Sequence, residues 1–362
     1  MAPKKNETVI IPVIPQAVPV VPPTALGNSR YENIYEGQLT NTFTTVNSKK
    51  TKHREIIDKN GNQGWLFDLN EIGGGDVVLS EPDKNTLSMT SSQLLDIIAL
   101  RLTEVLPYGG SDEELTKHLD CKFRVEDYMH FRELTVKEDA VKQLKKDLKA
   151  LFNASTIATI THHVGKGKER KKISEKLEVH YIDAIPKGPV REYVHFRIAL
   201  SFARYLVHSQ VMPYPLGILS SSKNKNFYYI GKKLAAHYNM NKKKKNAESV
   251  SVESLLAYTP EIPTFAEESE RGRHYKQKCM EPLVRTLDEM VEKSLLQEWT
   301  IWHGKNKPLS DEELSSWSFS RDSGQDLFIH FKLKDYPENQ KRIQSKDILL
   351  IENDENTQYS GV

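Results

Sequence analysis

The stretch that decides the fold reads SVESLLAYTP at residues 251–260, TFAEESERGRHYKQKCMEPLVRTLDEM at 264–290 and LLQEWTIWH at 295–303. Ser251 is placed to cap a short helix, because a serine side chain can accept a hydrogen bond from a free backbone N–H of the first turn. Thr264 and Glu267 have the spacing of a capping box, which predicts a second helix start. The segment from Leu295 predicts a strand that opens a hairpin.

The long helix expected after residue 271 has an apolar face and a polar face. Residues at helical spacing form the apolar face, namely Tyr275, Cys279, Met280, Leu283, Leu287 and Met290. The opposite face carries long hydrogen-bonding side chains, namely His274, Gln277, Lys278, Glu281 and Arg285. Pro282 predicts a kink or a restart, because proline has no N–H to donate. A helix, a turn, a polar-faced helix and a hairpin follow each other as in a winged helix, which can place its second helix in the major groove of DNA.

The same order of elements is predicted once before, over residues 88–184. Capping-box spacing predicts three helix starts, at Thr90 with Gln93, Ser111 with Glu114 and Thr135 with Glu138. The last of these helices runs to Phe152 and has its core face at Val141, Leu144, Leu148 and Leu151. Its outer face carries Lys142, Gln143, Lys146 and Lys149. Strand-like STIATITHH and KLEVHYIDAI then flank the basic tip GKGKERKK. The predicted fold class is therefore α+β, with two tandem winged-helix domains (helix-turn-helix plus β-hairpin wing).

Composition shifts predict the domain boundaries. The segment APKKNETVIIPVIPQAVPVVPP at 2–23 is so rich in proline that it is expected to be an extended arm. The Asn60-Gly61 pair predicts a hairpin turn, and Pro213 and Pro215 place the domain junction at 211–221. We expect a disordered proline-rich arm at 1–50, a β-hairpin lead-in at 51–85, a first winged helix with a connecting strand and helix at 86–212, a second winged helix at 213–337 and an acidic tail at 338–362.

The whole-chain composition limits the class of protein. The 362 residues suffice for roughly two domains and tails. Because 51 basic residues balance 49 acidic ones, only the clustering of the basic side chains indicates a nucleic-acid partner. Cys121 and Cys279 lie in apolar patterns and are expected to be buried free thiols. No apolar run approaches the roughly 20 residues of a membrane helix, so we expect a cytoplasmic protein without membrane contact.

Catalytic motifs are not recognisable in the sequence. A rolling-circle nicking enzyme needs a His-hydrophobe-His metal site and a tyrosine nucleophile, whereas His162 and His163 are adjacent. Tyr228 and Tyr229 adjoin the apolar stripe of their helix, so packing is their expected role. The sequence contains no Walker A loop, zinc-ligand spacing or nucleophile elbow. We therefore predict a protein that is not an enzyme and that needs neither a metal nor a cofactor.

Three segments together carry a family resemblance: VHFRIALSFARYL at 194–206, NFYYIGKKLAAHY at 226–238 and YKQKCMEPLVRTLDEM at 275–290. The last segment combines a basic start, the step Met280-Glu281-Pro282 and a helical tail. In these features the chain resembles the iteron-binding replication initiators (Rep proteins) of theta-replicating plasmids. The resemblance implies a bacterial, nucleoid-associated protein that binds repeated origin DNA, helps to melt adjacent duplex and recruits host replication proteins. It also implies dimerisation through the first winged helix and repression of the protein's own promoter.

The predicted DNA-binding residues lie on two helices and one wing. Lysines are expected to grip phosphates, whereas glutamine and arginine can make bidentate contacts to base edges. The predicted residues are Lys142, Gln143, Lys146, Lys149, Lys166, Lys168, Arg170, Lys171, Lys172, Arg271, Arg273, His274, Gln277, Lys278 and Arg285. Glu281 is expected to form a salt bridge with Arg285 rather than to accept a hydrogen bond from cytosine.

Two alternative functions stay open from the sequence. A winged-helix transcriptional repressor without an initiator role would use every one of the same DNA-contact residues. An origin-nicking enzyme would instead show metal-dependent cleavage that depends on a tyrosine such as Tyr228.

Overall fold

The protein is described here by a computed structural model of the whole chain. It describes residues 18–20, 31–36, 52–57, 61, 63–68, 76–80, 87–107, 109–132, 134–164, 171–185, 192–219, 224–304, 307–310, 312–313, 319 and 326–337. Within this part of the chain, helices alternate with sheets, and the expected α+β class is confirmed. None of the described helices combines the length and the apolarity that crossing a membrane requires.

Two sheets organise the N-terminal part of the chain. One sheet has the order β1 (Val18–Val20), β6 (Asp120–Arg124), β10 (Tyr193–Ile198) and β9 (Ile182–Ala184), with β1 parallel to β6. The other has the order β3 (Lys52–Ile57), β4 (Gln63–Asp68), β5 (Asp76–Leu79), β7 (Ala154–Val164) and β8 (Lys171–His180). The predicted hairpin at Gly61 is confirmed, because Ile57 faces Gln63 across it and Gly61 has a φ of 82° that suits glycine.

The helices of this part pack around one apolar core. Helix α2 (Met89–Val105) packs against α5 (Lys137–Phe152), α4 (Val125–Phe131) packs against α5, and α3 (Asp112–Thr116) packs against α6 (Leu200–Val207). The predicted core face of α5 is confirmed, since Leu144, Leu148 and Leu151 are fully buried and Val141 packs against the core. The connecting strand and helix predicted within 86–212 are confirmed by β10 and α6.

Two of the predicted capping boxes are wrong, and the structure gives the reason for each. Helix α2 is capped by Ser88 with Ser91 rather than by Thr90 with Gln93. The Thr90 hydroxyl instead donates to Asp147 at 2.6 Å, and the Gln93 side chain accepts from Arg132. Helix α5 begins after Val136, whose side chain caps nothing, so Thr135 lies outside the cap position. The predicted helix starts at Ser111, Ser251 and Thr264 are confirmed by side-chain hydrogen bonds.

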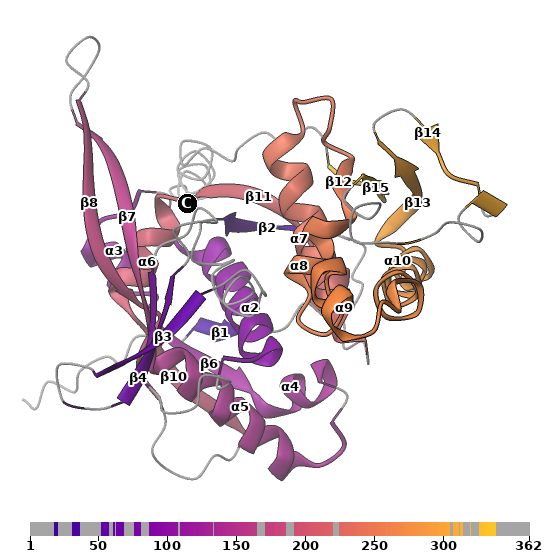
Figure 1. Cartoon of the computed structure of the whole chain (residues 1–362). Helices are drawn as coiled ribbons and strands as arrows, with labels where there is room; N and C mark the ends of the chain where they lie inside the picture. Colours follow the sequence, from indigo (N-terminus) through magenta and orange to yellow (C-terminus); the bar gives the residue numbers. More distant parts are fainter. Residues whose placement is uncertain are drawn as a thin grey trace, which may run out of the picture.

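The segment expected to be a disordered arm contributes two strands. β1 pairs with β6, and β2 (Tyr31–Glu36) pairs over its whole length with β11 (Gln210–Pro215). Both strands are extended, as frequent prolines predict, but hydrogen bonds tie them to the folded part of the chain. Pro213 and Pro215 therefore lie in a strand at the expected junction and not in an open linker. Figure 1 shows the β2–β11 ribbon running between α2 and α7 (Lys225–Asn241).

The C-terminal part repeats the predicted order with one sheet of its own. After η4 (Leu216–Leu219) and α7 come β12 (Ser249–Ser251), α8 (Val252–Tyr258), α9 (Phe265–Arg271), the π-helical turn η5 (Lys276–Met280) and α10 (Glu281–Glu292). Strands β13 (Leu296–His303), β14 (Lys307–Pro308) and β15 (Leu327–Leu333) complete the sheet, whose order is β12-β15-β13-β14. In the N-terminal part, by contrast, β6 pairs with β10 and not with the hairpin strand β8. Both parts run from helix to strand to helices and end in a hairpin, but the number of helices and the sheet topology differ between them.

Gly231 gives a test of the packing between α7 and η4. A Cβ atom there would lie 2.5 Å from Ile218 Cγ2 and 3.2 Å from Leu295 Cδ2. Alanine favours a helix over glycine by about 1 kcal/mol, but overpacking a tight core costs about 1–3 kcal/mol. We expect Gly231→Ala to lower the free energy of unfolding in urea by about 1 kcal/mol. The control Gly217→Ala meets no atom within 4 Å, so an equal loss there would contradict the packing explanation.

Candidate nucleic-acid interface

A tight turn orients the helix that carries the predicted base-reading residues. Helix α9 ends at Arg271, and the N–H groups of Gly272 and Arg273 both donate to the Glu268 carbonyl, at 3.1 and 3.0 Å. The buried Glu268 side chain accepts from the His274 N–H at 3.0 Å. Arg273 adopts a left-handed φ of 63°. Two helices joined by a short, fixed turn have the local geometry of a helix-turn-helix.

The expected effect of Pro282 is found as a π-helical turn followed by a new α-helix. The Glu281 N–H donates to the Lys276 carbonyl, five residues back, and Pro282 then lies in the first turn of α10. Proline is tolerated there because first-turn N–H groups have no partner within the helix. The adjacent Cys279 and Met280 at the end of this turn are both buried in the core. Turns of this kind occur often at functional sites.

The two faces of η5 and α10 are those predicted. The apolar face is buried at every position, that is at Tyr275, Cys279, Met280, Leu283, Leu287 and Met290. The polar face is exposed at every position, that is at His274, Gln277, Lys278, Glu281 and Arg285, and Arg271 and Arg273 are exposed beside it. Among the described residues no ion pair joins Glu281 to Arg285, so the salt bridge expected between them does not form. The guanidinium of Arg285 is therefore not engaged by Glu281.

Contacts on the inner side hold α10 in place. Asn224 Nδ2 donates to Thr286 Oγ1 at 2.9 Å and to Glu289 Oε2 at 3.1 Å. Trp299 Nε1 of β13 donates to Asp288 Oδ1 at 3.1 Å. These bonds tie α10 to the start of α7 and to the sheet, so the exposed face is presented from a supported helix.

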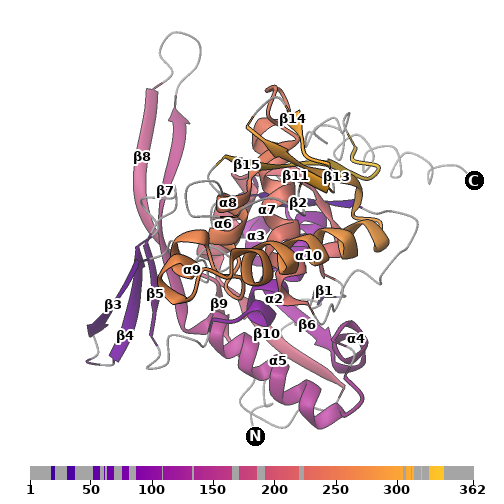
Figure 2. The same cartoon turned by 45° about the vertical axis from the view of Figure 1, so that its right-hand side comes forward.

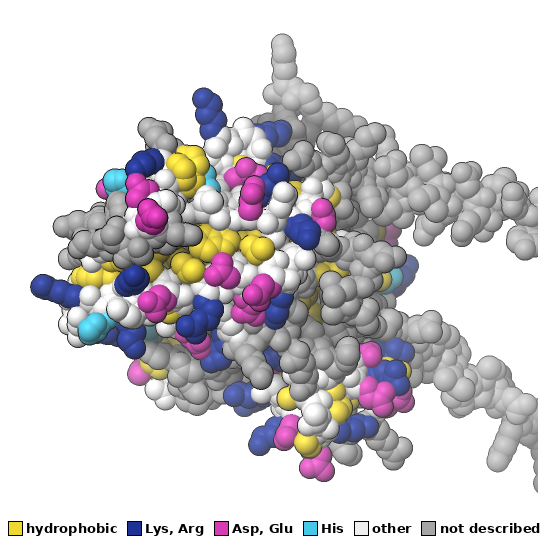
Figure 3. All heavy atoms as spheres, turned by 90° about the vertical axis from the view of Figure 1, so that its right-hand side faces the viewer, with side chains coloured by type: hydrophobic (Ala, Val, Ile, Leu, Met, Phe, Trp, Pro, Cys, Tyr) yellow, Lys and Arg dark blue, Asp and Glu magenta, His cyan; other side chains and the backbone are white. Residues whose placement is uncertain are grey.

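The surface around this helix is mixed in charge. Figure 3, which views the molecule from the right-hand side of Figure 1, shows Lys and Arg side chains interspersed with Asp and Glu around a band of hydrophobic side chains. A mixed surface gives a weaker long-range attraction for DNA than a uniformly basic one. Affinity at this face would therefore depend on individual contacts more than on bulk charge.

The second predicted helix, α5, presents a basic face with one internal exception. Lys142, Lys146 and Lys149 are exposed, whereas Gln143 is half-buried and donates to Asp147 Oδ1 at 3.0 Å and to Thr90 Oγ1 at 3.2 Å. Burial raises the pKa of the Asp147 carboxyl, although hydrogen bonds from Thr90, Tyr128 and Gln143 oppose that rise. Gln143 thus has an internal role that the i,i+4 spacing to Asp147 could have indicated.

The wing residues are only partly placed. Lys166, Lys168 and Arg170 lie outside the described residues, and Lys171 and Lys172 lie on β8 without described side chains. The β7–β8 hairpin is paired from Ser155 with His180 to Val164 with Lys171, and Figure 1 shows it projecting away from the helices. In the second hairpin, Lys307 pairs with Glu313, whose carboxylate also accepts a hydrogen bond from the Ser310 N–H.

Four consecutive lysines, residues 242–245, lie in a loop that follows α7. All four of its lysines are exposed between α7 and β12. Figures 1 and 2 both show this end of α7 away from α9.

Among the described residues, no group of three or more His, Cys, Asp or Glu side chains is arranged to hold a metal ion.

Glu268 gives a test of how the turn is held. We expect Glu268→Ala to lower the free energy of unfolding by about 1–2 kcal/mol, because the His274 N–H loses its acceptor. Glu268→Gln keeps a carbonyl oxygen at the acceptor position and should retain most of that stability in urea denaturation. If both variants lose the same free energy of unfolding, the carboxylate does not stabilise the turn through its hydrogen bond to His274.

Comparisons with known proteins give a distant structural similarity. No protein-family model matches the chain, and the comparison with curated proteins gives no match. A crystal structure of RctB domains 2-3 is similar with a TM-score of 0.37 and 10% identity, covering 82% of this chain and 96% of that chain. A structure of selenomethionine derivatives of domain 2 and domain 3 of RctB has a TM-score of 0.37 and 9% identity, covering 81% and 98%.

Proposed function

We propose that the chain is a DNA replication initiator that binds repeated origin DNA through two winged helices, with η5 and α10 as the helix that contacts bases. The single observation that carries this proposal is the exposed polar face at His274, Gln277, Lys278 and Arg285 on a helix whose other face is entirely buried. Glutamine and arginine can contact adenine and guanine bidentately. The surface is thus suited to the recognition of a base sequence.

The topology of the C-terminal part supports a winged helix there. Helix α7, strand β12, helices α8 to α10 and the β13–β15 hairpin follow in order, and β12 joins the sheet beside β15. For the N-terminal part the support is the element order and the basic face of α5. Figure 2 brings α10 and α5 into one view, with α10 across the middle of the molecule and α5 below it.

The initiator role rests on the sequence resemblance to iteron-binding Rep proteins. It implies a cytoplasmic protein without catalytic activity, which recruits host replication proteins and dimerises through its first winged helix. Supercoiled origin DNA should stay uncut on incubation with the protein and a divalent metal, and cleavage would favour the nicking enzyme.

DNA binding is tested by fluorescence anisotropy with the DNA that flanks the gene, against scrambled DNA, at several salt concentrations. One phosphate contact each from Arg271, Arg273, Lys278, Lys142, Lys146 and Lys149 predicts a slope of log K against log salt of about −5. Specific binding to direct repeats supports the initiator and leads to a minimal-origin transformation assay. Binding to an inverted repeat alone favours the repressor, and equal binding to scrambled DNA rejects sequence-specific recognition.

A further inference from the structure

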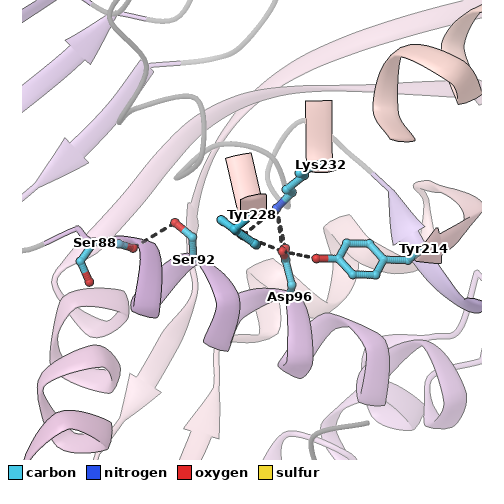
Figure 4. A network of polar contacts seen from close by, with 6 residues as sticks. All are labelled: Ser88, Ser92, Asp96, Tyr214, Tyr228 and Lys232. Carbon is cyan, nitrogen blue, oxygen red and sulfur yellow. Dashed lines mark hydrogen bonds and ion pairs between the residues drawn. The ribbon is translucent and has the colours of Figure 1, made fainter. Parts of the chain in front are cut away.

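A buried ion pair lies between the two parts of the molecule. Lys232 Nζ of α7 lies 2.7 Å from Asp96 Oδ1 and 2.9 Å from Asp96 Oδ2 of α2. The Asp96 side chain is fully buried, and the Lys232 side chain is 3% exposed. Figure 4 shows the ammonium group and the carboxylate pointing toward each other from the two helices. Sequence patterns give no sign of this pair, because its members are 136 residues apart.

Two tyrosines complete the hydrogen bonding of the carboxylate. The hydroxyl groups of Tyr214 from β11 and of Tyr228 from α7 each donate to Asp96 Oδ2 at 2.7 Å. Burial, followed by the negative charge of Asp96, raises the pKa of Tyr214, so its hydroxyl keeps the proton that it donates. The carboxylate therefore accepts from three side chains that approach from two different elements.

The network joins the helices that lie behind the two proposed DNA-binding surfaces. Helix α2 packs against α5, and α7 packs against α10. A buried ion pair adds little stability over a well-packed apolar contact, but it demands one geometry, because a shift of one helix along the other would separate buried charges. The pair is therefore suited to fixing a register rather than to adding stability.

A second connection between the two parts lies at the β2–β11 ribbon. The Tyr31 hydroxyl of β2 donates to the Lys334 carbonyl after β15 at 2.8 Å. The Tyr31 ring also meets the Tyr336 ring edge-on, with centroids 5.4 Å apart. The N-terminal strand thus contacts both the junction and the end of the C-terminal sheet, which restricts the same relative motion.

We propose that Asp96 and Lys232 are positioning residues that fix the separation and angle of α5 and α10, so that the protein selects DNA sites by the spacing of two half-sites. The inference rests on the proposed function. It assigns to Asp96 and Lys232 an effect on DNA specificity although neither residue contacts DNA. The competing explanation is that the pair serves folding only. The two explanations differ in whether the orientation of α5 relative to α10 changes when both charges are removed and the protein still folds.

The first experiment needs no DNA. Spin labels at Asp139→Cys on α5 and Glu292→Cys on α10 report the distance between the two helices, since both positions are exposed. The native Cys121 and Cys279 are buried, and burial raises the pKa of Cys121 to about 12, so neither competes for the label. The test variant is Asp96→Asn with Lys232→Met, which removes both charges and keeps an oxygen acceptor for the tyrosines.

The matched control is Lys225→Met with Glu261→Gln, which neutralises an exposed ion pair that also starts from α7. A narrow distribution of the label-to-label distance is expected for the parent and the control. For the test variant, we expect a distribution that is at least twice as broad as that of the parent or is displaced from it. An unchanged distribution in a test variant that still folds overturns the proposal. If that variant does not fold, Tyr214→Phe removes one donor and keeps the ring; an unchanged distribution there also counts against the proposal.

The second experiment uses two half-sites whose spacing is changed one base pair at a time. The parent should prefer one spacing over its neighbours by about tenfold in Kd, which corresponds to about 1.4 kcal/mol. The test variant should reduce that preference to within about threefold, again measured as a ratio of Kd values. If the parent binds sequence-specifically but equally well at all spacings, the positioning role of the pair is rejected and the proposed function is not. A parent without sequence-specific binding rejects the function, while the distance measurement still tests the pair.

Discussion

Lys232→Met alone is expected to lower the free energy of unfolding by about 3–5 kcal/mol, because it leaves the Asp96 carboxylate buried without its cation. Asp96 is fully buried, and after this change the Tyr214 and Tyr228 hydroxyls are the hydrogen-bond donors left to it among those described above. Two neutral donors do not replace an ammonium group at 2.7 Å. Urea denaturation followed by circular dichroism measures the loss directly.

A second change should restore most of that loss. Adding Asp96→Asn to Lys232→Met removes the unpaired charge and leaves a neutral site, so the double variant should lie within about 1–2 kcal/mol of the parent. The exposed pair of Lys225 and Glu261 gives the comparison, since Lys225→Met should cost less than about 1 kcal/mol. A double variant no more stable than Lys232→Met would show that the cost comes from lost packing of the lysine stem and not from the charge.

Local features of the chain were predictable because short-range physics decides them. The buried and exposed faces of η5 and α10 follow from helical spacing. The missing N–H of Pro282 predicted a kink or a new helix start at that position. The capping boxes at Ser111 and Thr264 form as predicted, because each joins residues only three positions apart. The hairpin at Gly61 likewise depends on residues that are neighbours in sequence.

Long-range partners explain what the sequence could not predict. Thr90 and Gln93 have capping-box spacing, but their side chains bind Asp147 of α5 and Arg132 just after α4. Gln143 lies on the outer face by periodicity, yet it is held inward by Thr90, which is 53 residues away in the chain. The pairing of β2 with β11 and of Asp96 with Lys232 joins segments more than 130 residues apart, and a single sequence contains no signal for such contacts.

The exposed helix should separate base contacts from phosphate contacts in binding measurements. Gln277→Ala is expected to weaken binding to the matched DNA site by about 1–3 kcal/mol, since a bidentate amide contact to adenine is lost. Arg285→Ala should cost a similar amount at a guanine. Both side chains are exposed, and the helix beneath them is held by the Asn224 and Trp299 contacts, so folding should not change. Anisotropy with a panel of single-base variants of the site measures the effect.

The decisive comparison is with Lys146→Ala on α5, whose side chain is also exposed but is assigned to a phosphate. Loss of one phosphate contact should weaken binding to all sequences alike and reduce the salt slope by about 1. Gln277→Ala should instead leave scrambled-DNA binding and the salt slope unchanged, while binding becomes insensitive to one base position. Because neither residue contributes to the core, stability cannot produce this contrast. Uniform loss on every sequence in both variants would mean that α10 grips the backbone without reading bases, and the site would then be recognised through DNA shape.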